Sequence, residues 1–187
     1  MTFPEAYTAD FKYPSEAHKY LELTRPYLHG LVLDCGSGGW PVVPHAIQVE
    51  LPSDQFNSYT GGRTPAFPIQ IHGDIWNLPF KDNSVDAIHS SHLIEDFSRE
   101  SWVGLFKEWA RVLKPGGHLV ILVPEHERWQ YCVQVLGQCP NCSHHGKEPS
   151  VGDVGNAGKQ AGLKVVKEHL TELFPNDYSI LGVLQKP

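Results

Sequence analysis

The first apolar run of the chain, Leu31–Leu33, and the residues that follow it constrain the fold more than any other feature. The run is short and has a β-branched residue at its centre, which suits a buried strand of a parallel sheet. Asp34 comes next, followed by Gly36, Gly38 and Gly39. Glycine lets the backbone turn sharply and approach a ligand closely. The segment therefore predicts a strand, a tight turn and a ligand site at the end of the strand.

The acid in this turn limits the class of ligand. Asp34 would repel a phosphate, so the turn favours a ligand that carries hydroxyl groups and a positive charge. Dinucleotide-binding turns also follow strands, but their usual third glycine is missing here, where Pro41 stands. A plain tight turn with no ligand is the remaining alternative.

Composition narrows the class of protein further. The chain has 187 residues, of which 41% are hydrophobic, so we expect a single domain with a substantial core. The formal charge of −6 and the lack of basic runs argue mildly against an extended nucleic-acid surface. No signal peptide or membrane-spanning stretch is evident, and four cysteines do not form a disulfide framework. We expect a cytoplasmic protein whose oligomeric state the sequence leaves open.

Strand-like and helix-like segments alternate along the chain. This order predicts an α/β fold, a Rossmann-like seven-stranded, mostly parallel sheet with helices on both faces and an antiparallel C-terminal hairpin. The expected helices start at Ser15 and span 99–113 and 153–161. The expected strands start at Leu31 and cover 46–51, 69–72, 85–89, 118–123, 163–170 and 178–184.

The connection between the first two strands is unusually short. A parallel crossover normally needs about a dozen residues and contains a helix. Pro41 and Pro44 lie in this connection and disfavour a regular helix. We therefore expect the first crossover helix to be shortened or missing. Residues 52–68 are expected to form a surface loop, or a short helix and a loop.

Several motifs occur in the order of one known family. Together they resemble the class I S-adenosylmethionine-dependent methyltransferases, specifically a type-11-like domain, over about residues 28–125. The motifs are Asp34-x-Gly-x-Gly, Glu50 ending the second strand, Gly73-Asp74-Ile75, Ser84-Val-Asp-Ala-Ile and Arg111-Val-Leu-Lys-Pro-Gly-Gly-His-Leu-Val-Ile.

The resemblance implies S-adenosylmethionine as the cofactor and in-line methyl transfer to a small-molecule or modest-sized acceptor. It implies that Glu50 accepts the ribose hydroxyls, that Asp74 binds the adenine amino group and that the Ile75 backbone contacts the ring edge. A solvated acid for Glu50 and a turn cap for Asp74 are the alternatives. The cofactor-binding residues implied are Asp34, Gly36, Ser37, Gly38, Glu50, Leu51, Asp74, Ile75, His89 and Ser90.

Two histidines are candidate catalytic residues. His92 follows the fourth strand, where the family places groups near the transferred methyl, and His126 follows the fifth. Either could act as a general base, because the histidine pKa is near neutrality. A capping or packing role is the alternative. Related sequences often read His-x-x-Glu-His here, and Asp96 replaces the last histidine, which puts a copied role in doubt.

The remaining cysteines and histidines suggest, but do not complete, a metal site. Cys139 and Cys142 have zinc-like spacing, and His144 or His145 could add ligands. Only one such pair is present, so we assign no metal and take an exposed loop with reduced thiols as the alternative.

The chain is expected to form one domain over residues 1–187, with an N-terminal arm and helix at 1–27. Residues 124–150 are expected to form an acceptor-side insertion. Besides an enzyme, the pattern allows an S-adenosylmethionine-binding module of the same fold that is catalytically weak or inactive. A Rossmann-type oxidoreductase is disfavoured by the missing third glycine and the acid in the first turn.

Overall fold

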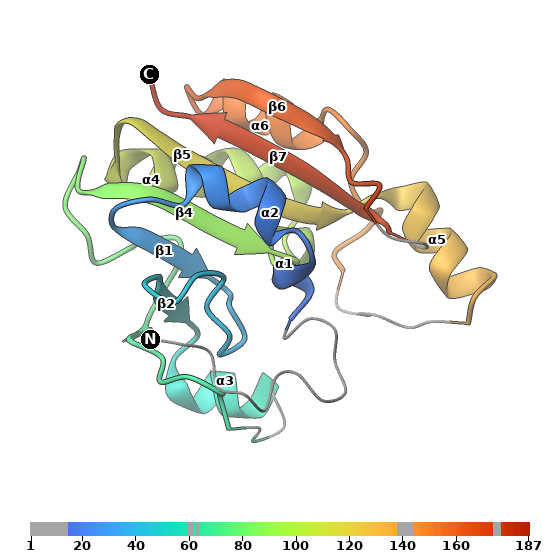
Figure 1. The fold of residues 1–187 in the computed structure, drawn as a ribbon, viewed down its shortest axis with the longest axis horizontal. Helices are drawn as coiled ribbons and strands as arrows, with labels where there is room; N and C mark the ends of the chain where they lie inside the picture. The colour runs from blue at the N-terminus through green and yellow to red at the C-terminus, as the bar shows by residue number, and fades with distance from the viewer. Residues whose placement is uncertain (1–14, 60–61, 63, 138–143, 174–176) are drawn as a thin grey trace.

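A computed structural model describes residues 15–59, 62, 64–137, 144–173 and 177–187. Its seven strands form one sheet in the order β3-β2-β1-β4-β5-β7-β6 (Figure 1). The strands are β1 (Val32–Cys35), β2 (Ile47–Glu50), β3 (Ile71–His72), β4 (Val85–Ser91), β5 (Leu113–Pro124), β6 (Lys164–Leu170) and β7 (Ser179–Gln185).

Only β7 runs against the other strands. The pairs among β1, β2, β3, β4 and β5 are parallel, whereas β7 pairs antiparallel with both β5 and β6. The chain leaves β1 toward β2 on one side and returns to β4 on the other. This confirms the predicted Rossmann-like sheet with its antiparallel C-terminal hairpin, and it puts a topological switch point at the carboxyl end of β1.

Helices cover both faces of the sheet, as predicted. In Figure 1, α1 and α2 lie over the near face, whereas α4 and α6 lie behind it. The α-helices are α1 (Glu16–Lys19), α2 (Leu21–Thr24), α3 (Ser53–Tyr59), α4 (Trp102–Val112), α5 (His126–Gln134) and α6 (Asp153–Gln160). The described residues also include the 3₁₀ turns η2 (Arg25–Tyr27), η3 (Ile94–Asp96) and η4 (Arg99–Ser101).

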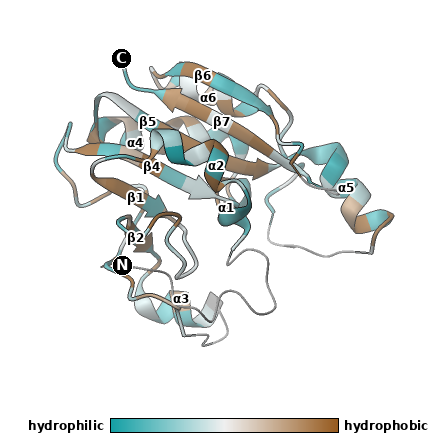
Figure 2. Cartoon of the chain, in the orientation of Figure 1, coloured by the Kyte–Doolittle hydropathy of each residue, from teal (hydrophilic) through white to brown (hydrophobic). Residues whose placement is uncertain are grey.

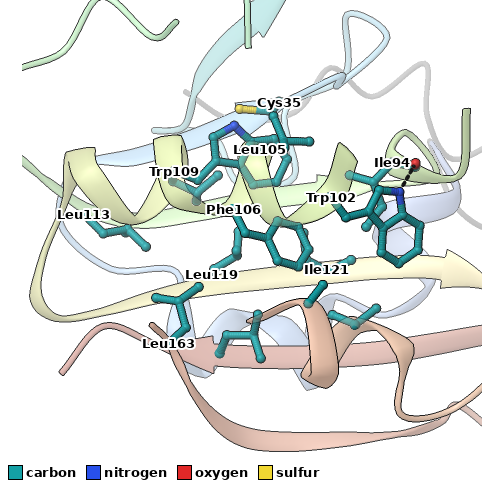
Figure 3. Close-up of a cluster of buried hydrophobic side chains, with 14 of the residues drawn as sticks. Cys35, Ile94, Trp102, Leu105, Phe106, Trp109, Leu113, Leu119, Ile121 and Leu163 are labelled. Carbon is teal, nitrogen blue, oxygen red and sulfur yellow. Dashed lines mark hydrogen bonds between the residues drawn. The ribbon is translucent and has the colours of Figure 1, made fainter. Parts of the chain in front are cut away.

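Each face has its own hydrophobic core. The apolar stripe of α4 is fully buried against β4 and β5 and includes Trp102, Phe106 and Trp109 (Figure 3). On the other face, Tyr20 and Leu28 pack against Val42 and Val43. The hydrophobic strands of Figure 2 therefore lie between two apolar layers, as a parallel sheet requires.

The first crossover, residues 36–46, contains no helix, which confirms the expectation based on its prolines. The predicted helix from Ser15 is broken at Tyr20 and continues into the 3₁₀ turn that contains Pro26. The fifth strand begins at Leu113, five residues earlier than the predicted 118, and its register against β4 shifts between Val85 and Ala87. Residues 113–117, which were expected to form a turn before the strand, thus belong to β5 and contain a bulge.

Several expectations fall on residues outside the described part. These are the N-terminal arm at 1–14, Cys139, Cys142, and Pro175 and Asn176 of the hairpin turn. Within the described part, none of the helices combines the length and apolar character that crossing a membrane requires.

Candidate active site

A cavity of about 510 Å³ opens at the carboxyl ends of β1 and β2, beside the segments that follow β3 and β4. Ligands of open α/β sheets bind at this type of switch point, and the volume is that of a small-molecule site. The lining residues are Gly36, Gly38, Val49, Glu50, Leu51, Pro52, Gln55, Phe56, Gly73, Asp74, Ile75, Trp76, His92, Leu93, Asp96 and Phe97.

The glycine turn forms one wall of the cavity because it approaches closely without side chains. Gly36 and Gly38 have φ angles of 74° and 63°, values that other residues adopt only with strain. A Cβ on Gly36 would lie 2.8 Å from Leu93 Cδ2, whereas a Cβ on Gly38 would extend into open space. The turn therefore leaves room for a ligand over Gly38.

Glu50 ends β2 and faces the same cavity. Its carboxylate accepts hydrogen bonds from the Gly38 backbone N–H and from Ser37 Oγ at 3.1 Å, both at Oε1. Burial raises the pKa of this carboxyl, and these hydrogen bonds oppose the shift only in part. A buried carboxylate at this position can accept hydrogen bonds from ligand hydroxyl groups.

Asp74 and Ile75 form the opposite wall, directly after β3. Asp74 Oδ1 accepts from the Trp76 backbone N–H at 2.8 Å, and the Ile75 carbonyl accepts from Trp109 Nε1 at 3.0 Å. The Trp76 ring meets Phe97 edge-on, with centroids 5.4 Å apart. An acid, a fixed backbone and aromatic rings together suit a flat heterocycle.

Asp34 was expected to bind the cofactor, and it is not among the residues that line the cavity. Its carboxylate accepts from the Val42 backbone N–H at 2.6 Å through Oδ2, and its Oδ1 lies 2.7 Å from His89 Nδ1. Both side chains are buried, as is Ser90. The reason is that the short crossover folds back over the end of β1, so Asp34 satisfies the crossover's backbone. Ser37 likewise supports Glu50 from outside the lining.

The two candidate catalytic histidines occupy different places. His92 lines the cavity in a left-handed conformation with φ 51°, and its backbone N–H donates to the Leu122 carbonyl. His126 begins α5 outside the lining, with Nδ1 2.7 Å from Glu148 Oε2.

Both ring nitrogens of His92 face protein groups. Nδ1 lies 3.4 Å from Glu95 Oε1, and Nε2 lies 3.2 Å from Ser179 Oγ. Burial alone would lower the pKa of His92, but the interaction with the nearby Glu95 carboxylate outweighs burial, so the pKa is raised. The imidazole is therefore held in place by the protein on two sides.

Sequence reasoning missed part of the cavity wall. Phe56 comes from α3, whose sequence lacks a repeating apolar pattern, so no periodicity signals the helix. Phe97 and Asp96 come from the segment after β4, and only the departure of Asp96 from the family pattern drew attention to that segment.

No metal site is present among the described residues, in which no group of three or more His, Cys, Asp or Glu could hold a metal ion. His144 instead contacts Glu148 and the Trp129 ring. His145 is exposed, and its backbone N–H donates to the Glu95 carbonyl.

Known proteins with similar sequences include methyltransferases. A family model described as "Methyltransferase domain" matches residues 47–121. This part of the chain is therefore similar to a methyltransferase domain. The match begins with β2 and ends within β5, and it includes Glu50, Asp74, Ile75 and His92 of the cavity lining. S-adenosylmethionine is the cofactor.

The curated relatives of the chain carry different names. The human "Probable tRNA methyltransferase 9B" is 30% identical over 57% of this chain and 28% of its own length. The "Demethylmenaquinone methyltransferase" of Staphylococcus saprophyticus is 38% identical over 37% of this chain and 27% of its own length. The chain thus spans little more than a quarter of either relative.

The fold has close structural counterparts. A solved SAM-dependent methyltransferase of Thermotoga maritima, described as a possible histamine N-methyltransferase, superimposes with a TM-score of 0.62. That match covers 91% of this chain and 92% of the other at 18% identity, so it concerns the fold alone.

The residues of the cavity fit the cofactor of this family. The open space over Gly38 leaves room for a ligand, and the buried Glu50 can accept from hydroxyl groups. Asp74 and the aromatic pair Trp76–Phe97 suit an adenine ring. Three acids and no lysine or arginine lie in the described lining, which suits a ligand with a sulfonium charge.

Proposed function

We propose that the domain transfers the methyl group of S-adenosylmethionine to a small-molecule or modest-sized acceptor. The observation that carries this proposal is the single cavity shared by the glycine turn, Glu50 and Asp74. When bound, the cofactor supplies an activated methyl group on a sulfonium. The protein then has to orient the reactants and exclude water.

The roles of the lining residues follow from their chemistry. Glu50 accepts the ribose hydroxyls, Asp74 accepts from the adenine amino group, and the Ile75 backbone contacts the ring edge. Leu51 covers the nucleoside from the end of β2. Asp34, Ser37 and His89 act from beneath, by fixing the turn and Glu50 rather than by touching the cofactor, whereas Ser90 is buried at the end of β4.

The charge distribution supports a small acceptor over a nucleic acid. The described cavity lining is acidic, and Arg111 and Lys114 are paired with Asp82 and Asp86. Binding of a phosphate backbone needs clustered, available cations. A tRNA acceptor, to which the name of the human relative points, is therefore the less favoured alternative.

A binding module without turnover is the second candidate function. Both ring nitrogens of His92 face protein groups, and His126 lies outside the cavity lining. This arrangement provides no evident general base in the described cavity. Methyl transfer to an already nucleophilic acceptor requires none, so the enzyme remains the first candidate.

The experiment that separates these functions combines binding with turnover. Calorimetry with S-adenosylmethionine tests the cofactor site, and methyl-labelled cofactor with a panel of small amines, phenols and quinols, and with tRNA, tests transfer. We expect binding and label in a small molecule. Binding without transfer would favour the module, label in tRNA would overturn the acceptor class, and the absence of binding would overturn the proposal.

We further propose that the protein is cytoplasmic and that residues 1–187 form a single domain. Cys35 is a free and buried cysteine, which is typical of a reducing compartment. Cell fractionation with thiol labelling tests the location, and a single cooperative unfolding transition is expected for one domain.

A further inference from the structure

From the cavity wall inward, partly buried imidazoles and buried carboxylates alternate in one series of contacts, which we call the His–Glu chain. His92 Nδ1 lies 3.4 Å from Glu95 Oε1, and the same oxygen lies 3.9 Å from His144 Nε2. His144 Nδ1 lies 3.4 Å from Glu148 Oε1, whose other oxygen lies 2.7 Å from His126 Nδ1. The His–Glu chain therefore runs from the cavity wall to the start of α5.

Both carboxylates of this chain are removed from solvent. Glu95 is 3% exposed and Glu148 is 6% exposed. Within the described residues, no hydrogen-bond donor satisfies either oxygen of Glu95. A buried carboxylate costs several kcal/mol unless an opposite charge compensates it. The imidazoles that face Glu95 and Glu148 can provide this compensation only when they are protonated.

The His–Glu chain joins three separate segments. His92 and Glu95 belong to the stretch after β4, which also supplies Leu93, Asp96 and Phe97 to the cavity. Backbone hydrogen bonds accompany the side-chain contacts. The His145 N–H donates to the Glu95 carbonyl at 2.9 Å, and the His126 N–H donates to the Pro149 carbonyl at 2.9 Å. The cavity wall at 92–97 is thus fastened to residues distant in sequence.

We propose that Glu95 and Glu148 are positioning residues, which hold the cavity wall at 92–97 in its binding geometry through their contacts with the imidazoles of His92, His144 and His126. The role goes beyond methyl transfer itself. This positioning role rests on the proposed function only in the part of the test that measures cofactor affinity.

The groups around the His–Glu chain are consistent with this role. Ser179 Oγ and the Tyr178 ring contact His92, and the charges of Glu16 and Lys19 on α1 act on it with opposite signs. The Trp129 ring lies against His144, with centroids 5.1 Å apart. Further away, Asp177 is held by Tyr20 and Thr171. Lys19 is the cation that acts on His92, and it opposes the raised pKa.

The pH dependence has a defined sign. The pKa of His92 is raised, so its stabilising ion pair is complete below the ordinary histidine pKa and is lost as pH rises through the raised value. The pKa of Glu148 is lowered because hydrogen bonds from His126 and His144 outweigh its burial. Its contribution is lost only in acid. The His–Glu chain should therefore hold the cavity wall most strongly in mildly acidic solution and less strongly above neutral pH.

The test uses the full chain and the variants Glu95→Gln and Glu148→Gln, which keep the shape and remove the charge. Glu100→Gln, at an exposed position, is the matched control. Calorimetry measures S-adenosylmethionine affinity at about pH 6 and about pH 8, on either side of the histidine pKa. Hydrogen exchange measures protection of the His145 amide, and thermal unfolding checks that each variant is folded.

For the wild type, we expect cofactor affinity and His145 protection to fall by several-fold between the two pH values. In Glu95→Gln we expect both to be lower at the acidic pH and nearly independent of pH, while Glu100→Gln follows the wild type. Wild-type affinity, protection and pH profile in both folded test variants would overturn the positioning role. If the wild type binds no S-adenosylmethionine, the proposed function fails. Hydrogen-exchange protection of the His145 amide then still tests the positioning role of Glu95 and Glu148.

Discussion

The Glu50 carboxylate accepts a hydrogen bond from the Gly38 backbone N–H, so the acid that ends β2 fixes the glycine turn that follows β1. The two strands are neighbours in the sheet, which brings the ends of both to one edge. The acid and the turn, which both line the cavity, therefore form one hydrogen-bonded unit. A change in either is expected to disturb the other.

Glu50→Ala is expected to weaken S-adenosylmethionine binding by roughly 1–3 kcal/mol, because it removes a charged acceptor and releases the Gly38 N–H. Calorimetry checks this value. The control is Glu22→Ala, whose side chain is 84% exposed on α2. Equal affinities for Glu50→Ala and the control would place the nucleoside elsewhere.

Asp34→Ala is expected to lower the free energy of unfolding by roughly 2–5 kcal/mol, because it leaves the Val42 N–H and His89 without their buried partner. Asp34→Asn keeps the shape and should cost less. Urea denaturation gives both values. Cofactor affinity shows whether Asp34 supports the turn or contacts the cofactor directly. If folded Asp34→Asn loses as much affinity as Glu50→Ala, Asp34 binds the cofactor directly.

Trp102→Phe is expected to destabilise the fold by roughly 2–5 kcal/mol, since it leaves a cavity and an unpaired carbonyl. Trp102 Nε1 donates to the Ile94 carbonyl at 2.7 Å in a fully buried position (Figure 3). This bond links the core to the segment that borders the cofactor cavity. Chemical denaturation measures the loss, and an unchanged midpoint would show that the bond contributes nothing.

Two glycines in helices should respond oppositely to alanine. Gly104 is exposed in α4, and its added Cβ would be 4.0 Å from Trp76, so Gly104→Ala should stabilise the fold by about 0.4–1 kcal/mol. A Cβ on Gly158 would lie 2.5 Å from Leu184 Cδ1 in the core, so Gly158→Ala should destabilise by about 1–3 kcal/mol. Urea denaturation of the pair tests both signs, and effects of one sign would contradict this packing.

The decrease in the free energy of unfolding at acidic pH should depend in part on Glu108. Its hydrogen bonds from Arg111, together with one from the Leu78 N–H, lower the pKa of this carboxyl in spite of its burial. A lowered folded-state pKa stabilises the fold above the ordinary glutamate pKa and is lost as pH falls through the lowered value. Glu108→Gln should therefore reduce the loss of stability on acidification. A decrease at acidic pH identical to that of the wild type would exclude this contribution.

Much of the sheet could be predicted because its signals are local. The apolar runs, the glycine turn and the Lys114–Gly117 segment each identify an element without knowledge of its neighbours. The missing crossover helix was likewise predictable from Pro41 and Pro44. Strand ends were less certain, since β5 extends to Leu113 only through pairing with Val85.

Parts of the site could not be predicted because they depend on contacts between distant segments. Asp34 has the family's acid position, but its hydrogen bond to Val42 arises from the way this short crossover folds. Likewise, Glu95 and His144 are 49 residues apart and their approach leaves no periodic trace in the sequence. Phe56 lies on a polar-looking helix, so only the cavity identifies its place.

The helix-free crossover has a consequence for where the chain can be cut. Val42 and Val43 cover only part of their face of the sheet, and Ala17, Tyr20 and Leu28 complete that layer. A shortened version that starts after Leu28 would expose hydrophobic surface over β1 and β4, and we expect it to self-associate. The smallest autonomous unit for engineering or fusion therefore has to begin no later than α1.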